Sequence, residues 1–223
     1  MSAIFITATG TDVGKTFVAS GLIRHWRSSA QDVDALKPVA TGYDPAHAEA
    51  SDAGHLLLAL GRALGPPELD RISPWRFAAA LSPDMAARNE GKSLNFDNLV
   101  EYCRQAIASQ RGTLLIEGIG GVMVPLDDRH TVVDWIAALN IPAVLVTGSY
   151  LGSLSHTLTC VDVLRRRKLV IKALVVNETP GSAVPMAETI QTLTNFVAPI
   201  PVAQLSRIST MHDREFAAIA ALL

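Results

Sequence analysis

The fold of this chain is decided near its N-terminus by the stretch AIFITATGTDVGKT, residues 3–16. Its apolar beginning predicts a buried strand, and the residues that follow it, Thr16-Phe17-Val18-Ala19-Ser20, have the character of a helix. A glycine-containing turn between a strand and a helix, ending in Gly-Lys-Thr, is typical of loops that bind phosphate. The usual spacing of such loops asks for glycine at position 9, where this chain has Thr9. The placement predicts a phosphate loop whose first turn is altered.

Short apolar runs alternate with helix-like segments along the rest of the chain. We expect strands at Ala3–Ala8, Val33–Lys37, Thr113–Glu117, Ala143–Thr147 and Ala173–Asn177. We expect helices at Lys15–Ser29, Asp52–Ala63, Asp97–Gln110, Val132–Ala138, Ser153–Arg166 and Val184–Phe196, with Asp97 as a cap. The proline-rich region Gly65–Asn95 predicts a long irregular excursion over the strand ends. The alternation predicts a single α/β domain, residues 1–223, doubly wound around a mostly parallel sheet in the manner of P-loop NTPases.

The 223 residues carry 19 Lys and Arg against 21 Asp and Glu, a formal net charge of −2. With no global basic field we expect neither nucleic acid nor a membrane as partner, so a highly charged ligand must be held by local groups. The N-terminus does not read as a signal peptide, and no apolar run approaches the roughly 20 residues of a membrane span. We therefore expect a cytoplasmic protein. Cys103 and Cys160 lie far apart, and both are interpreted as small buried apolar side chains.

Three polar positions fall where such a phosphate loop would need them. Lys37 ends an expected strand, at the sheet edge where open α/β proteins bind ligands, although by itself it would be interpreted as a solvated lysine. Glu117 ends another apolar run, where nucleoside triphosphatases hold an acidic residue near Mg²⁺; the alternative is a surface glutamate in a tight turn. Asp52 alone is typical of a helix cap, and becomes a candidate second carboxylate for Mg²⁺ only beside the others.

Two further segments have a functional and a plain interpretation. Asn177 ends the last strong strand, where it would reach a base edge, although a turn asparagine is the simpler interpretation because Glu178-Thr179-Pro180-Gly181 follow it. The segment Leu151-Gly152-Ser153 opens a helix whose free N–H groups suit a carboxylate or a phosphate. His156 on that helix has no evident partner and is interpreted as structural.

These pieces occur together in one family. They are Lys15-Thr16, Lys37-Pro38-Val39-Ala40-Thr41-Gly42, Ser51-Asp52, Glu117-Gly118-Ile119-Gly120-Gly121, Leu151-Gly152-Ser153 and Val176-Asn177. Their order and spacing resemble those of dethiobiotin synthetases over nearly the whole chain. The K-P-V-A-[ST]-G and E-G-x-G-G segments are far more specific than the phosphate loop. The family's loop usually reads G-T-D-T-x-V-G-K-T, and here Ala8 replaces its first glycine while Gly10 replaces its aspartate.

The resemblance implies a homodimeric, Mg-ATP-dependent ligase acting on 7,8-diaminononanoate and CO₂ or bicarbonate. A carbamate forms on one amine, ATP phosphorylates it, and the second amine closes a cyclic urea with release of ADP and phosphate. This chemistry needs positioning and charge neutralisation more than acid–base groups, because the attacking carbamate is already an oxyanion. A set of residues rich in Lys, Thr, Gly and carboxylates suits it.

The resemblance also implies a role for individual residues. Lys15, Lys37 and Thr11 would be catalytic, and Thr16, Asp52 and Glu117 would hold Mg²⁺. The nucleotide would contact Asp12, Val13, Gly14, Lys15, Thr16, Phe17, Asp52, Glu117, Gly118, Ile119, Gly120, Asn177, Glu178, Ser206, Arg207 and Ile208. The organic substrate would contact Thr11, Thr41, Leu151, Gly152, Ser153 and Ser155, the helix start receiving its carboxylate across a dimer interface. Ser155 stands where asparagine is familiar.

Three other classes of protein are disfavoured by single features. A ParA- or MinD-like nucleotide switch carries a lysine five residues before the loop lysine, where this chain has Gly10. A GTPase would show N-K-x-D after the late strand, but Asn177 is followed by Glu178. A cobyrinic-acid-type amide ligase would need a glutaminase domain, for which 223 residues leave no room. The nucleotide-switch ATPase is the alternative that we keep.

Overall fold

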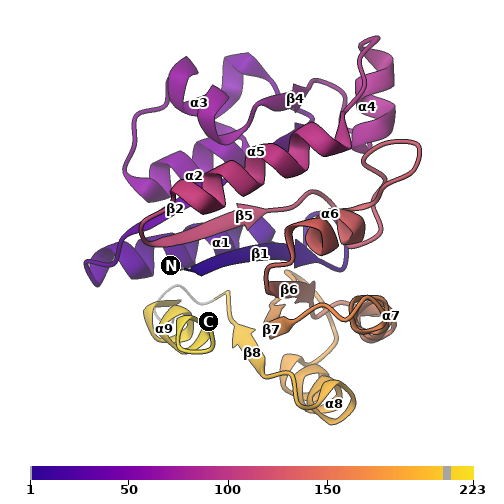
Figure 1. Cartoon of the computed structure of the whole chain (residues 1–223). Helices are drawn as coiled ribbons and strands as arrows, with labels where there is room; N and C mark the ends of the chain where they lie inside the picture. Colours follow the sequence, from indigo (N-terminus) through magenta and orange to yellow (C-terminus); the bar gives the residue numbers. More distant parts are fainter. Residues whose placement is uncertain (1, 208–211) are drawn as a thin grey trace.

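The computed structural model describes residues 2–207 and 212–223, and its main feature is a six-stranded sheet in the order β2-β5-β1-β6-β7-β8 (Figure 1). All of its strand pairs are parallel. The strands are β1 (Ser2–Ala8), β2 (Val33–Leu36), β5 (Thr113–Glu117), β6 (Ala143–Gly148), β7 (Ile171–Asn177) and β8 (Val202–Leu205). The expected doubly wound α/β fold is confirmed, and the carboxyl ends of the strands meet at one edge of the sheet, where such folds bind ligands.

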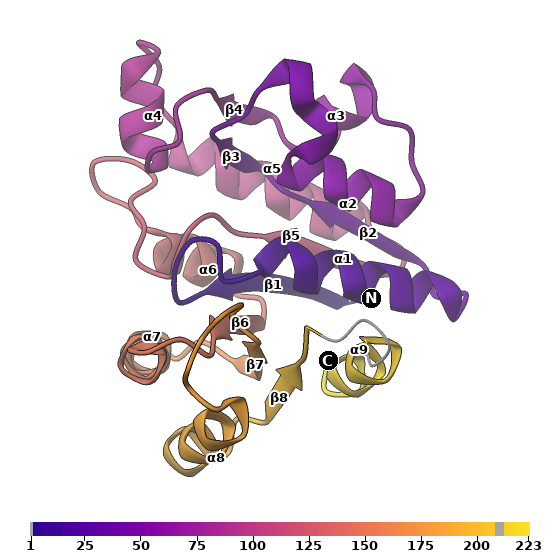
Figure 2. The same ribbon diagram turned by 180° about the vertical axis from the view of Figure 1, so that it is seen from behind.

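Helices cover both faces of this sheet, as right-handed crossovers between parallel strands require. One face carries α1 (Lys15–Ser28), α2 (Asp52–Leu60) and α9 (His212–Ala220), with α1 in contact with the other two (Figure 2). The other face carries α5 (Phe96–Ser109), α6 (Val132–Leu139), α7 (Ser153–Arg166) and α8 (Met186–Val197). None of the helices in residues 2–207 and 212–223 has the length and apolarity that a bilayer crossing demands.

The core is built on β1, whose continuous apolar run is covered on both sides. Ile4, Phe5 and Ile6 are at most 2% exposed. The ring of Phe5 meets the fully buried ring of Trp135 edge to face, with centroids 4.8 Å apart. Cys103 is buried as expected, whereas Cys160 is only partly covered. The burial of β1 holds the beginning of the phosphate loop on a rigid support.

The expectation of an irregular region at Gly65–Asn95 is wrong. It contains α3 (Pro66–Ile72), β4 (Trp75–Phe77) and α4 (Pro83–Asn89), and β4 pairs in parallel with β3 (Val39–Thr41). Two of the prolines that looked disruptive, Pro66 and Pro83, stand at the first positions of helices, where a missing N–H costs nothing. A short 3₁₀ helix, Pro45–Ala50, precedes α2.

The N-terminal caps of two helices also differ from expectation, because in each case a neighbouring residue is the cap. The side chain of Asn95 accepts from the N–H of Asn98 and starts α5, so Asp97 lies inside the first turn and is not the cap. Helix α2 begins after Ser51, whose hydroxyl accepts from the N–H of Gly54, and ends at the left-handed Gly61. Asp52 is therefore not the cap of α2, and its carboxylate is available for other contacts.

The contact between α1 and α9 leads to a prediction at Gly21. A Cβ at this position would lie 1.9 Å from the ring of Phe216. Glycine to alanine normally stabilises a helix by about 1 kcal/mol, but overpacking costs about 1–3 kcal/mol. We expect Gly21→Ala to lower the free energy of unfolding in urea. Adding Phe216→Leu should recover part of that loss, and a purely additive double variant would contradict the contact.

Candidate active site

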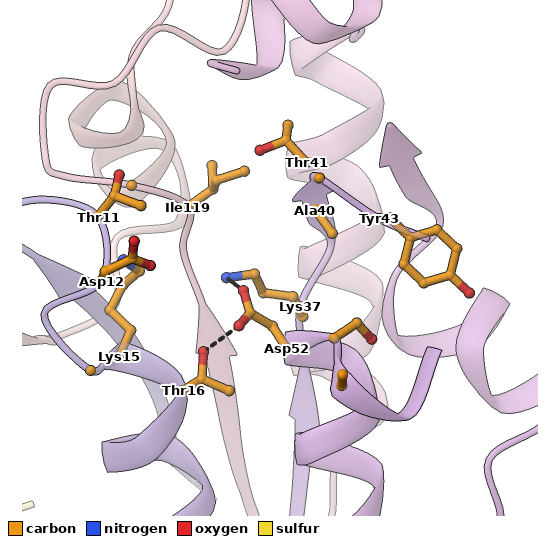
Figure 3. Close-up of a pocket in the computed structure, with 15 residues that line it drawn as sticks. Thr11, Asp12, Lys15, Thr16, Lys37, Ala40, Thr41, Tyr43, Asp52 and Ile119 are labelled. Atoms are coloured by element: carbon orange, nitrogen blue, oxygen red, sulfur yellow. Dashed lines mark hydrogen bonds and ion pairs between the residues drawn. The ribbon is translucent and has the colours of Figure 1, made fainter. Parts of the chain in front are cut away.

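The phosphate loop opens onto a cavity of about 480 Å³ at the carboxyl edge of the sheet. The loop contributes Thr11, Asp12, Gly14, Lys15 and Thr16 to its wall, and other elements contribute Lys37, Thr41, Tyr43, Asp52, Ile119 and Gly120. Figure 3 shows the side chains of Lys37 and Asp52 meeting inside this cavity, with Thr16 joined to Asp52. Tyr43, which was not predicted as a site residue, directly follows the K-P-V-A-T-G segment. The guanidinium of Arg76 lies 5.2 Å from the centre of its ring.

The loop itself has the backbone of an anion-binding turn. Asp12 and Gly14 have positive φ angles, 58° and 100°. Gly14 precedes the first residue of α1 and supplies no side-chain cap, so the helix presents its first N–H groups to the cavity. The ammonium of Lys15 donates to the carbonyl of Gly10 across the loop at 3.2 Å. A Cβ on Gly10 would meet nothing within 4 Å, so the altered first turn does not require glycine there for steric reasons.

Lys37 directly follows β2 and is almost completely buried, at 1% exposure, so the interpretation as a solvated lysine is wrong. The register of the sheet explains its neighbours, because Leu36 lies opposite Ile116 and the next residue on each strand comes alongside. Its ammonium lies 2.7 Å from Glu117 Oε1 and 2.8 Å from Asp52 Oδ2, and donates to the carbonyl of Gly118 at 2.8 Å. All three ammonium hydrogens have an acceptor.

The hydroxyl of Thr16 completes this cluster from the start of α1. It lies 2.7 Å from Asp52 Oδ1 and 2.8 Å from Glu117 Oε1. Glu117 is 1% exposed, which excludes the surface-glutamate alternative, and its Oε2 is buried with no hydrogen-bond partner among the described residues. Two carboxylates, one of them with an orphaned buried oxygen, and one hydroxyl are the hard oxygen donors that Mg²⁺ takes, so the residues present fit that ion.

The charges in the cluster shift one another's pKa values. Burial would by itself lower the pKa of Lys37, but Glu117 and Asp52 outweigh it and raise that pKa. Burial likewise opposes ionisation of Asp52, yet Lys37 and the Thr16 hydrogen bond bring its pKa down to about 2. Burial raises the pKa of Glu117 in spite of Lys37. For Lys15, burial and the neighbouring charge of Lys37 lower the pKa to about 8.

A second group of predicted residues meets at the ends of β7 and β8. Asn177 lies opposite Leu205, and its side-chain amide donates to the carbonyl of Val13 in the loop at 3.0 Å. The carboxylate of Glu178 accepts from the N–H of Arg207 at 2.8 Å. Ile208 lies outside the described residues.

Ser206, in the same group, is held by a residue that the sequence analysis missed. The carboxylate of Glu215, which is 8% exposed, accepts from the N–H of Ser206 at 3.0 Å and from its hydroxyl. Nothing in its sequence context distinguished Glu215 from a solvated residue on an amphipathic helix. The predicted Phe17 lies in the first turn of α1, where its ring meets that of Phe216 with centroids 5.9 Å apart.

The predicted substrate residues on α7 do not reach the cavity of Lys37. Leu151 is 90% exposed, Gly152 has a φ of 99°, and Ser153 is buried with its hydroxyl unpartnered among the described residues. His156, further along α7, lines a second, more open cavity of about 440 Å³ together with Met123, Val124 and Cys160. Thr11 lines both cavities.

His156 has a partner after all. Its Nδ1 lies 2.8 Å from the hydroxyl of Tyr150, across the turn that begins α7. Ser155 stands beside it, near the start of α7, and the carbonyl of Ser155 accepts from the hydroxyl of Thr159.

Comparison with known proteins identifies relatives of this chain. A family model described as an AAA domain matches residues 2–213. The ATP-dependent dethiobiotin synthetase BioD of Acidiphilium cryptum is 50% identical over 202 residues, which cover 90% of this chain and 91% of the relative. The protein of the same name from Phenylobacterium zucineum is 45% identical over 204 residues, covering 91% of this chain and 87% of the relative.

Solved structures resemble the chain in fold. The septum site-determining protein MinD of Pyrococcus horikoshii, complexed with Mg-ADP, has a TM-score of 0.55 at 15% identity, covering 97% of this chain and 85% of its own. The MinC:MinD complex of Aquifex aeolicus has a TM-score of 0.56 at 10% identity, covering 96% and 86%. At such identities the likeness shows the P-loop fold alone. The relative from Acidiphilium cryptum shares half of the aligned residues over about nine tenths of both sequences. The chain therefore belongs to the family of ATP-dependent dethiobiotin synthetases.

Proposed function

We propose that this chain uses Mg-ATP to join CO₂ to 7,8-diaminononanoate and close the cyclic urea of dethiobiotin. The observation that carries the proposal is the cluster of Lys37, Asp52, Glu117 and Thr16 in the cavity that the phosphate loop opens onto. The cluster places fixed positive charge and magnesium ligands beside a triphosphate site, without a Ser-His-Asp arrangement in the described cavity lining. That combination fits phosphorylation of an oxyanion.

In this mechanism the phosphate loop holds the nucleotide. The first N–H groups of α1 and the ammonium of Lys15 bind the phosphate oxygens, and Lys15 exchanges its bond to the carbonyl of Gly10 for one to phosphate. Thr16, Asp52 and Glu117 would hold Mg²⁺, which when bound supplies positive charge to the phosphate oxygens. Adenine would lie by Asn177, Glu178, Ser206 and Arg207. Val13, Phe17, Gly118, Ile119 and Gly120 would also lie near the nucleotide.

The carbamate would be held opposite, between Lys37 and Thr41. The carbamate oxygen attacks the γ-phosphorus of ATP and forms a new P–O bond. The bond between the γ-phosphorus and the β,γ-bridging oxygen breaks, and ADP leaves. The second amine then attacks the carbonyl carbon, phosphate departs with the bonding pair, and that amine loses its proton. Lys37, held between two carboxylates, offers a pre-oriented cation to the charge that develops on the transferring group. Thr11 is in the lining of both cavities, where it would lie beside the carbamate and the nucleotide.

The direct test gives the purified protein Mg-ATP, ¹³C-bicarbonate and 7,8-diaminononanoate, and looks for the label in a cyclic urea by mass spectrometry. We expect one ADP for each urea, and no urea when any one component is omitted. Hydrolysis of ATP at the same rate with and without the diamine, and no labelled product, would support a nucleotide-switch ATPase instead.

The lowered pKa of Lys15 predicts a pH dependence of ATP binding. With a pKa of about 8 in the free enzyme, Lys15 loses its charge as the pH rises, so ATP affinity falls by about fivefold between pH 8 and pH 9. Isothermal titration calorimetry across this range measures the change. In Lys15→Arg the guanidinium stays charged, so the dependence should vanish. Equal slopes in the two proteins would show that another group titrates.

We further propose that two copies associate through the face at the start of α7, so that this helix start in one copy receives the substrate carboxylate of the other. Support comes from the apolar side chains that this face exposes, Leu151 at 90% and Met123 at 54%. The N–H groups and the buried hydroxyl at Ser153, with Gly152 and Ser155 beside it, suit a carboxylate.

Leu151→Asp is expected to halve the mass measured by light scattering after size exclusion, because it introduces charge into the apolar contact. Leu58, 74% exposed on α2, provides the matched control Leu58→Asp, which should leave the mass of a dimer unchanged. A wild-type protein that runs as a monomer at the concentration of the assay would refute the dimer.

A further inference from the structure

We propose that Asn177 is a positioning residue for the phosphate loop, and that it supports the binding of any triphosphate irrespective of the base. The inference rests on the proposed function, since it assumes that the loop holds phosphates. It extends the role expected for Asn177, which was contact with adenine alone.

The contact that carries the proposal joins two segments 164 positions apart in the sequence. The side-chain amide of Asn177 donates to the carbonyl of Val13 at 3.0 Å. The same amide packs against the next residue, because a Cβ on Gly14 would lie 2.2 Å from its nitrogen. Since a carbonyl oxygen only accepts, the group that faces Val13 is the NH₂ and not the oxygen of the carboxamide.

Asn177 is itself held firmly. It is the last residue of β7, where it lies opposite Gly148 of β6 on one side and Leu205 of β8 on the other. The following N–H, that of Glu178, donates to the carbonyl of Leu205 at 2.9 Å. The loop, by contrast, leaves Thr11 and Asp12 exposed, and takes the left-handed conformation at Asp12 and Gly14. A fixed strand end thus restrains a loop with unfavourable backbone angles.

The direction of the bond has a chemical consequence. In a trans peptide the C=O and the N–H point in opposite directions. Drawing the carbonyl of Val13 toward β7 therefore turns the N–H of Gly14 away from β7, and Gly14 is part of the cavity wall. If this peptide turned over, a carbonyl dipole would replace the N–H and repel phosphate oxygens. The bond of Asn177 selects the peptide orientation that an anion needs.

This role is separate from recognition of the base. One N–H of the carboxamide is used on Val13, and within residues 2–207 and 212–223 no hydrogen bond engages the second N–H or the oxygen, which a ligand can therefore use. Contact with adenine would affect adenine nucleotides alone. Support of the loop would affect every ligand that carries the same phosphates, including one with no base.

The test compares dissociation constants of Mg-ATP, Mg-GTP and inorganic tripolyphosphate for the wild type and Asn177→Asp. Aspartate keeps the shape of asparagine but cannot donate to Val13, and its charge repels the carbonyl. We expect all three ligands to weaken by a common factor of about tenfold or more. The control Asn195→Asp adds the same charge at an exposed position of α8 and should leave all three dissociation constants unchanged. Asn177→Ala provides a second, uncharged removal of the donor.

Amide hydrogen exchange gives the readout that distinguishes support of the loop from general destabilisation. Without ligand, both Asn177 variants should exchange faster in the peptide covering residues 9–16, and at the wild-type rate in β1 and β5. Weakened ATP with unchanged tripolyphosphate, or an unchanged loop peptide, would overturn the proposal. A wild type that binds neither ATP nor tripolyphosphate would instead refute the proposed function on which this inference rests.

Discussion

Lys37→Ala is expected to lower kcat by about a thousandfold while the dissociation constant for ATP stays nearly unchanged. A unit charge 4 Å from another is worth on the order of 4 kcal/mol at an effective dielectric constant of 20, which corresponds to about three decades in rate. Lys37 already has its hydrogen-bonding geometry fixed by Asp52, Glu117 and the carbonyl of Gly118. Its charge therefore acts on the transferring phosphoryl group without reorganisation, whereas Lys15 and the loop backbone hold the ground-state triphosphate.

The experiment measures single-turnover kcat beside ATP binding by calorimetry. Removing Lys37 leaves two carboxylates without their cation and is expected to cost about 3–5 kcal/mol of stability, so the melting temperature is measured first and the assay is run below it. Lys172→Ala removes an exposed lysine from β7 and serves as the control for loss of charge. An unchanged kcat in Lys37→Ala would remove this lysine from the chemistry.

Glu117→Gln is expected to raise the Mg²⁺ concentration for half-maximal activity by at least 10-fold and, at saturating Mg²⁺, to lower kcat as well. The carboxylate is 1% exposed, contacts both Lys37 and Thr16 through Oε1, and leaves Oε2 without a partner among the described residues. Glutamine has nearly the same shape but no charge, so a magnesium ligand becomes weak and one counter-charge of Lys37 is lost.

Magnesium titrations of the steady-state rate measure this effect. Glu101→Gln, on the exposed side of α5, removes a carboxylate far from the cavity and should leave the titration curve where it is. A Glu117→Gln protein with the wild-type dependence on Mg²⁺ would show that Asp52 and Thr16 hold the ion without it. Loss of kcat at every Mg²⁺ concentration, with unchanged half-saturation, would assign Glu117 to the orientation of Lys37 alone.

The parts of the fold predicted from the sequence are those in which local composition and burial agree. In β1 the residues from Ala3 to Ile6 form an uninterrupted apolar run because both faces of the strand are covered, so this pattern alone marks a central strand. Strands β3 and β4 were not predicted because each has only three residues, too few for a period to show. Strand β8 is as long as the predicted β2, but it contains the exposed Gln204 and only Leu205 is buried, so its sequence lacks a continuous apolar run. Pro66 and Pro83 misled for a different reason, since proline breaks a helix in its interior and favours one at its first turn.

In the site, too, residues marked by their own sequence context could be predicted, whereas contacts between distant segments could not. Lys37 and Glu117 could be placed from sequence because each directly follows or ends a buried run, and parallel strands bring their carboxyl ends together. Glu215 could not, because its partner Ser206 lies nine positions away across a change of element, and nothing local marks the contact. The bond from Asn177 to Val13 was invisible for the same reason, as it depends on the loop geometry that Gly14 permits.

The strand order has a consequence for the protein while it is being synthesised. The loop leaves the ribosome early, yet β1 acquires its neighbours only after residues 113–117 and 143–148 have followed, and the bond from Asn177 forms later still. The contact of Phe216 with α1 comes almost last. Because translation proceeds at about 5–20 residues per second, the nascent loop remains without these supports for on the order of ten seconds or more. A nascent chain halted before β7 is therefore expected to bind triphosphate poorly, although every residue of its phosphate loop has already been made.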